Sequence, residues 1–186
     1  MSYVIPTPEL SVAKLEFYRN EAKKAALKRA QDLKLATSMD ELVFREANPG
    51  TDLSQPAGSG YTNETYLTGA AAINTWTSVY DTAGVARLGN RQIAVFYKVF
   101  VVNANPATTA VRFRLGLTGA TTLGWFFVEQ VINTALVPEA WFSEPVVYNP
   151  DQFMFIEFYP MAAVPAAGER LGFGCFIAEP IGESIS

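Results

Sequence analysis

Residues 93–102 form a strand-like stretch that is apolar on both faces apart from one lysine. A strand alternates its side chains between two faces, so a sheet with one solvent-exposed face alternates apolar and polar residues. The two predicted faces here are Ala94, Phe96, Lys98, Phe100, Val102 and Ile93, Val95, Tyr97, Val99, Val101. Both faces need cover, which we expect from a second copy of the chain, another protein or the chain's own N-terminal segment. This pattern indicates assembly rather than catalysis.

The composition excludes several classes of enzyme. The 186 residues are 49% hydrophobic, enough for one domain with an appendage and a packed core. There is no histidine, so the commonest general base and transition-metal ligand are missing, as are Ser-His-Asp and Cys-His sites. Cys175 is the single cysteine and cannot form a disulfide within the chain. We predict no enzyme activity, no catalytic residues, no metal site and no cofactor.

No targeting or membrane segment is predicted. No apolar run reaches the roughly 20 residues that cross a bilayer. The first six residues lack the basic and apolar regions of a secretory signal. We therefore expect a protein that is not secreted.

A long basic helix is predicted near the N-terminus. Residues 8–35 hold seven basic and four acidic side chains, which gives this segment a net charge of +3. Because the whole chain has a net charge of −4, the rest of it carries −7. Thr7 is suited to the N-cap, Pro8 to the first helical position and Glu9 to the first turn. No other proline or glycine follows before Leu35. The helix would extend roughly 40 Å and form a basic arm.

The basic side chains of this arm are candidates for binding an acidic neighbouring protein. The candidates are Lys14, Arg19, Lys23, Lys24, Lys28 and Arg29. An alanine-rich stripe at helical spacing favours docking on a neighbour over forming a core. Nucleic acid is not expected, because acids are interleaved and the body is acidic. A membrane surface is not expected, because large apolar residues are missing opposite the charges.

A β-domain is predicted to follow a linker. Residues 48–60 are dense in turn formers and separate an arm (1–47) from a β-domain (61–186). A short strand is expected at 41–46. The further strands are expected near 73–80, 92–103, 109–117, 124–132, 141–148, 152–160 and 171–178. Strands at this spacing predict a mainly β fold, an antiparallel, jelly-roll-like β-sandwich with a long N-terminal α-helical arm.

The strand faces predict one exposed sheet and one covered sheet. The strands at 109–117 and 171–178 alternate cleanly, whereas those at 125–132 and 152–159 are apolar on both faces except for Glu129 and Glu157. The covered faces could form an oligomer interface. The candidates for it are Phe96, Phe100, Phe153, Phe155 and Tyr159.

Two further hypotheses concern catalysis by acidic side chains and sugar binding by aromatic side chains. Glu129 and Glu157 could form a glycosidase pair, but single acids on strands are more often solvated or paired, here with Arg112 or Arg114. Aromatic side chains could stack on sugars, while packing in a core or interface is the more ordinary role. The candidates for stacking are Trp76, Trp125 and Trp141.

The layout of a basic helical arm over residues 8–35, a Gly/Ser/Pro linker and a histidine-free β body over residues 91–180 resembles capsid-associated jelly-roll proteins. The family it resembles is the decoration, or cement, proteins of tailed-bacteriophage heads. The resemblance is architectural and implies a homo-oligomer, with a trimer favoured, that clamps capsid or other structural proteins without chemistry. It implies no site residues. The expected location is the virion, or the cytoplasm if the chain is not viral.

These observations together predict a non-enzymatic structural assembly protein that decorates or cements a viral capsid. The alternative is a carbohydrate- or receptor-binding β-sandwich module of a virion.

Overall fold

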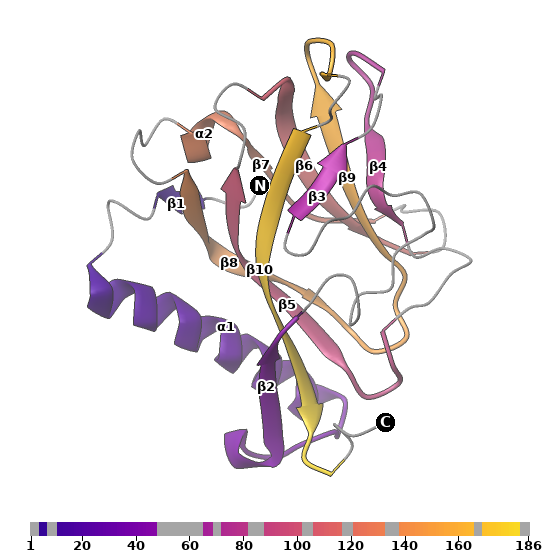
Figure 1. The fold of residues 1–186 in the computed structure, drawn as a ribbon. Helices are drawn as coiled ribbons and strands as arrows, with labels where there is room; N and C mark the ends of the chain where they lie inside the picture. Colours follow the sequence, from indigo (N-terminus) through magenta and orange to yellow (C-terminus); the bar gives the residue numbers. More distant parts are fainter. Residues whose placement is uncertain are drawn as a thin grey trace.

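The chain folds into two packed β-sheets with one long helix against the larger sheet (Figure 1). The computed structural model describes residues 4–6, 11–47, 65–68, 72–81, 88–101, 106–116, 121–132, 138–165 and 169–182. The mainly antiparallel β-sandwich confirms the predicted fold class. The predicted long helical arm is not supported, because helix α1 spans Val12–Asp32, 21 residues, and packs on a sheet of its own chain.

The larger sheet has six strands, all in antiparallel pairs. Strands β2 and β3 pair with opposite ends of the same long strand, β10, so together they form one edge. The strands across the sheet are β1 (Val4–Pro6), β8 (Glu139–Tyr148), β5 (Ile93–Val101), β10 (Glu169–Pro180), and then β2 (Leu42–Glu46) with β3 (Thr65–Thr68).

The smaller sheet has four antiparallel strands. A short 3₁₀ helix, η2 (Met39–Glu41), precedes β2, and a short helix, α2 (Glu129–Ile132), follows strand β7 (Thr121–Phe127) along the chain. The strand predicted at 124–132 therefore ends earlier than expected. The strands across the smaller sheet are β4 (Thr77–Asp81), β9 (Met154–Pro160), β6 (Thr108–Leu115) and β7 (Thr121–Phe127).

The main core lies between the sheets and consists of alternate inward-facing side chains. Phe96 is at its centre, with its ring centroid 5.2 Å from that of Phe113, 5.9 Å from Tyr148 and 6.0 Å from Phe173. The alternation predicted for residues 109–117 and 171–178 is confirmed where these residues are described, and one apolar face of the strand at 152–159 also points into this core. Inward-facing residues of these strands include Val111, Phe113, Met154, Ile156, Phe158, Leu171, Phe173, Cys175 and Ile177.

Strand β5 contains an extra residue at Tyr97. Its neighbours Phe96 and Lys98 pair with Cys175 and Gly174, two consecutive residues of β10, so Tyr97 is bulged. A one-residue insertion reverses which side chains face the core. The prediction that Lys98 shares a face with Phe96 is therefore wrong, because Phe96 points into the core and Lys98 lies on the outer face.

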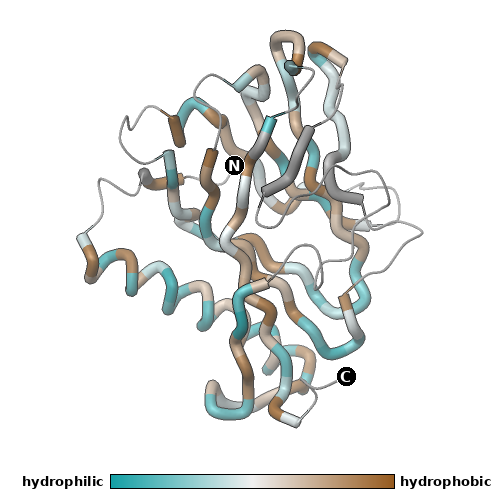
Figure 2. Tube along the Cα trace, in the orientation of Figure 1, coloured by the Kyte–Doolittle hydropathy of each residue, from teal (hydrophilic) through white to brown (hydrophobic). Residues whose placement is uncertain are grey.

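Helix α1 covers part of the outer face of the six-stranded sheet (Figure 1). Ala22, Ala26 and Ala30 are fully buried and bring the helix backbone close to this face. The sheet residues buried in the same cluster are Ile93, Val95, Tyr97, Trp141, Phe176 and Ala178. Of the three sources of cover considered for the second apolar face, the chain's own N-terminal segment provides it here. Along α1, hydrophilic residues alternate with apolar ones (Figure 2).

The ends of α1 differ from the expected ones. Ser11 is the N-cap, and its side chain accepts a hydrogen bond from the Lys14 backbone at 3.4 Å. The predicted start at Thr7, Pro8 and Glu9 lies outside the described residues. The helix ends at Asp32 because Lys34 adopts a left-handed conformation, with φ 58°.

The division into an arm, a linker and a β-domain stays a prediction, because the predicted linker at 48–60 lies outside the described residues. Within the predicted arm, β1 and β2 are both strands of the six-stranded sheet. Within the described part of the chain, no helix has both the length and the hydropathy to cross a membrane.

Candidate functional site: the outer face of the four-stranded sheet

The outward-facing side chains of the four-stranded sheet form two ordered rows. In one row Arg112 of β6 lies between Glu157 of β9 and Trp125 of β7. In the next row the short Ala110 lies between Tyr159 and Phe127. We call the surface that includes these rows the aromatic–arginine face, and its defining residues are Trp76, Arg112, Arg114, Trp125, Phe127, Glu157 and Tyr159.

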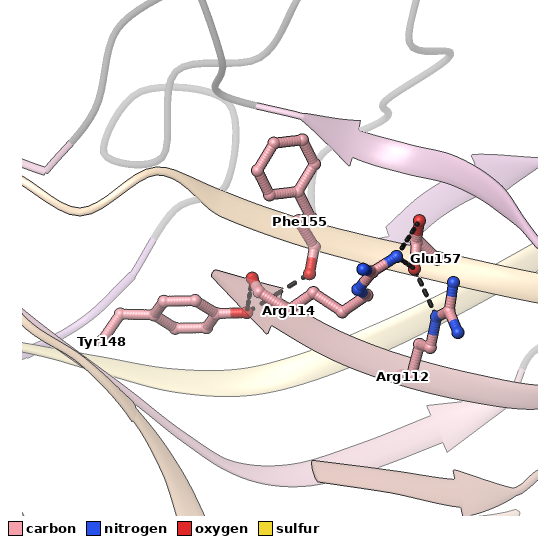
Figure 3. Close-up of polar contacts among 5 residues, drawn as sticks. All are labelled: Arg112, Arg114, Tyr148, Phe155 and Glu157. Atoms are coloured by element: carbon pink, nitrogen blue, oxygen red, sulfur yellow. Dashed lines mark hydrogen bonds and ion pairs between the residues drawn. The ribbon is translucent and has the colours of Figure 1, made fainter. Parts of the chain in front are cut away.

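Glu157 binds two arginines at the centre of this face (Figure 3). Arg112 donates from Nε to Glu157 Oε2, and Arg114 Nη1 lies 3.3 Å from the same oxygen and 3.4 Å from Oε1. The Arg112, Arg114 and Glu157 side chains are only 22%, 20% and 13% exposed, so solvent screens these pairs less than surface pairs. The expectation that Glu157 pairs with Arg112 or Arg114 is confirmed.

The other sheet supports this network from inside the sandwich. The Tyr148 hydroxyl of β8 lies 2.9 Å from the backbone oxygen of Arg114 and 3.2 Å from that of Phe155 (Figure 3). Tyr148 is fully buried, and its phenol therefore needs a partner within the protein. This contact bridges the two sheets at the point where β6 and β9 pair.

Aromatic rings flank the charged centre. The Trp76 ring lies 4.2 Å from the Arg112 guanidinium carbon, within cation–π range, and 5.2 Å from the Tyr159 ring. On the other side Trp125 packs edge-on against Phe127 at 5.0 Å. Phe127 is 42% exposed. Tryptophan, tyrosine and arginine are the residues that most often dominate protein–protein contacts.

The five predicted interface residues lie in different places. Phe96 is wrong as an interface candidate, because it is fully buried between the sheets. Phe100 is half-buried on the outer face of the six-stranded sheet, and Phe153 is half-buried before β9. Phe155 is on the outer side of β9 but buried, while Tyr159 belongs to the aromatic–arginine face.

Four of the six basic side chains predicted to bind a partner contact the chain itself. Arg19 bonds Glu46 of β2 at 3.0 Å, and the Lys23 ammonium lies 5.7 Å from the Phe176 ring centroid. These two contacts fasten α1 to the sheet. The other basic side chains are Lys24, bonded to Glu21, Arg29, bonded to Asn149, and the exposed Lys14 and Lys28. Their role in partner binding stays a prediction.

Glu129 and Glu157 do not share a strand environment. Glu129 is the first residue of α2 and is exposed, whereas Glu157 is paired with two arginines on β9. Within the described ranges, no group of three or more acidic or cysteine side chains is placed to hold a metal ion.

Sequence reasoning missed the stacking of Trp76 on Arg112 and the buried acid Glu169. Residues 73–75 form a turn, so Trp76 precedes β4 where a strand had been expected. Glu169 accepts hydrogen bonds from the backbone N–H groups of Ala107 and Thr108. No local sequence signal marks this contact or the stacking of Trp76 on Arg112, because each joins residues far apart in the chain.

Comparison with known proteins places the chain in no family. No family model matches it, and no curated protein does. One similar solved structure is the C-terminal CBM6 of LamC, a marine laminarinase from Zobellia galactanivorans. It has 13% identity and a TM-score of 0.33, with 74% of this chain and 99% of that chain covered.

A second similar structure is the VP2 subviral particle of infectious bursal disease virus. It has 8% identity and a TM-score of 0.34, with 75% of this chain and 32% of that chain covered. The chain thus spans about a third of the VP2 chain. Likenesses of this size carry no argument about ligand, partner or activity.

Proposed function

We propose that this protein is a non-enzymatic structural assembly protein that contacts other protein subunits through its aromatic–arginine face. The observation that carries the proposal is the arrangement of Trp76, Trp125, Phe127 and Tyr159 around an arginine–glutamate network on one sheet face. Such a face has large, rigid side chains at its edges and, at its centre, two arginines that share one glutamate. It matches the composition of energetically dominant contact sites between proteins.

The order of strands supports a jelly-roll topology. The series β2-β10-β5-β8 in one sheet and β4-β9-β6-β7 in the other is the order expected of an eight-stranded jelly roll built from two Greek keys. The predicted long helical arm is not supported, so this topology is the remaining point of resemblance to capsid-decoration proteins. Decoration or cementing of a viral capsid, with the chain located in the virion, is therefore the assembly we propose.

We further propose a homo-oligomer, with a trimer favoured, as the assembled form. Helix α1 covers part of the outer face of the six-stranded sheet, so the argument for an oligomer contact there is weaker. The exposed Phe127 at the edge of the aromatic–arginine face supports a contact on the opposite side of the sandwich. A stable contact buries about 1,200–2,000 Å² in total, so it would extend beyond these side chains.

Hydroxyl-radical footprinting of the full chain, free and in the assembly isolated from its source, tests the proposal. Aromatic side chains react with the radical when exposed, so Trp125, Phe127 and Tyr159 should be protected in the assembly. Phe17, 54% exposed on α1, is the matched control and should react equally in both states. Protection of Phe17 without protection of Phe127 would place the contact on the helix and contradict the proposal.

A further inference from the structure

A hollow of about 390 Å³ opens on the outer face of the six-stranded sheet, beside Arg19 of α1. At Gly172 and Gly174, β10 has no side chain on this face, and side chains of β5 pack over its bare backbone beside the hollow. A Cβ added at Gly174 would lie 2.6 Å from Lys98 Cγ and 2.8 Å from Tyr97 Cζ, closer than atoms can approach. The volume is in the range of small-molecule sites.

Aromatic side chains form the apolar part of the hollow. Phe100, Trp141 and Tyr97 belong to its lining and lie on the outer face of the sheet, whereas Phe173, also in the lining, has its ring in the core between the sheets. Phe100 is the half-buried one, and its ring covers Gly172, where an added Cβ would lie 1.9 Å from Phe100 Cζ. The ring is thus seated on bare backbone, which gives the hollow a fixed apolar wall.

Two ion pairs provide the charged groups, and three of their four side chains, those of Arg19, Glu46 and Lys98, belong to lining residues of the hollow. Arg19 bonds Glu46 at 3.0 Å, and Lys98 bonds Glu139 at 2.8 Å. The Tyr97 hydroxyl lies 2.9 Å from both oxygens of Glu46. Burial, and then the nearby Glu46 charge, raise the pKa of Tyr97, so the phenol keeps its proton and donates to this carboxylate. Glu46 is therefore held in one orientation before any ligand arrives.

The charges of these four side chains sum to zero, since two are cationic and two are anionic. A ligand with a full charge would have to compete with an existing ion pair. A hydroxyl can accept from a guanidinium or ammonium and donate to a carboxylate, and it leaves both pairs in place. An arginine has five donor hydrogens, a lysine three, and a carboxylate about four acceptor sites, so the ion pairs do not exhaust their capacity.

We propose that this hollow binds one neutral sugar residue of a glycan. Phe100 would pack against the apolar C–H face of the ring, and Glu46, Arg19 and Lys98 would bond its hydroxyls. The hollow is on the outer face of the six-stranded sheet and the aromatic–arginine face is on the outer face of the four-stranded sheet, so an assembled protein can still present this site. The inference does not depend on the proposed assembly function.

A titration of the ¹⁵N-labelled full chain with neutral methyl glycosides, those of glucose, galactose, mannose and N-acetylglucosamine, tests the proposal. The three tryptophans provide internal controls, because Trp141 lines the hollow and Trp76 and Trp125 belong to the aromatic–arginine face. At least one glycoside should shift the Trp141 indole N–H signal and leave the other two unchanged. Tryptophan-to-phenylalanine variants assign the three signals.

Two variants probe the wall and the polar group. Phe100→Ala removes the apolar wall, and Glu46→Gln keeps the shape of a half-exposed side chain while removing its charge. Each should weaken glycoside binding by about tenfold or more, the equivalent of about 1.4 kcal/mol. Phe17→Ala and Glu144→Gln, exposed residues outside the hollow, are matched controls and should bind as the unmodified protein does. If Phe100→Ala fails to fold, Glu46→Gln decides the outcome.

Several results would overturn the proposal. They are no shift of Trp141 with any neutral glycoside, a shift of Trp76 or Trp125 in its place, and unchanged binding by Glu46→Gln. A stronger response of Trp141 to glycine or inorganic phosphate than to every sugar would assign the hollow to a charged ligand and would also contradict it.

Discussion

The phenol of Tyr97 and the carboxylate of Glu46 join two strands that do not pair with each other. Tyr97 is the bulged residue of β5, Glu46 ends β2, and β10 lies between them. The hydroxyl reaches both carboxylate oxygens at 2.9 Å, and Arg19 of α1 bonds the same carboxylate at 3.0 Å. One acidic side chain therefore connects the helix, the edge strand and the bulge.

Replacing Tyr97 with phenylalanine should cost less stability than replacing it with alanine. The change removes a hydrogen bond to a charged carboxylate, about 1.5–3 kcal/mol, and keeps the ring stacked on Phe176, with centroids 4.5 Å apart. Tyr97→Ala also removes the ring and should cost about 3–5 kcal/mol. Urea unfolding followed by tryptophan fluorescence measures both. Equal losses for the two variants would show that the hydrogen bond, and not the ring, holds α1 in place.

Alkaline pH should destabilise the protein partly through Tyr97. Its pKa in the folded state is raised above the ordinary value of 10.0, so its contribution is fully present below pH 10.0 and falls as the pH rises further. Unfolding experiments above pH 10.0 should show a shallower loss of stability for Tyr97→Phe than for the unmodified protein. The remaining tyrosines titrate in both proteins, so parallel curves would contradict the prediction.

The alanines of α1 should not tolerate larger side chains. Ala26 is fully buried between the helix and the sheet, so Ala26→Leu overpacks the contact and should destabilise the fold by about 1–3 kcal/mol. Ala13→Leu, on an exposed position of the same helix, is the control and should be close to neutral. Chemical denaturation compares the two. A neutral Ala26→Leu would mean that α1 is not packed on the sheet.

Glu169 should be sensitive to loss of its charge. It is almost fully buried at the start of β10 and accepts hydrogen bonds from the backbone N–H groups of Ala107 and Thr108, the latter at 2.9 Å. Glu169→Gln turns a carboxylate oxygen into a donor facing a donor, which should cost about 1–3 kcal/mol. The exposed Glu144→Gln is the control, and thermal unfolding measures both. Equal unfolding temperatures would argue against a stabilising role for the hydrogen bonds between Glu169 and the backbone of Ala107 and Thr108.

Most strands and their faces could be predicted, because they depend on local periodicity. The alternation along β6 and β10 follows directly from the sequence, and the pairing of Glu157 with the arginines of β6 follows from the opposite charges. The bulge at Tyr97 could not be predicted. No glycine or proline marks it, and a single inserted residue reverses every later side chain of β5.

The sequence predicts the helix α1 and its packing stripe, but it does not identify the surface on which the helix packs. Ala22, Ala26 and Ala30 repeat at a spacing of four and form a narrow packing stripe. That stripe indicates a closely packed neighbour and does not say whether it is the same chain. The outer apolar face of β5 likewise indicates a covering neighbour without identifying it. Only the tertiary structure shows that α1 and this face cover each other.

Assembly should use the aromatic–arginine face and not the helix. Sedimentation velocity over a range of concentrations tests it with two variants of similar exposure, Phe127→Glu at 42% and Phe17→Glu at 54%. The unmodified 20.3-kDa chain should sediment as an oligomer, a trimer in our proposal, as should Phe17→Glu, whereas Phe127→Glu should sediment as a folded monomer. A monomeric unmodified chain at all concentrations, or dissociation by Phe17→Glu alone, would contradict the account.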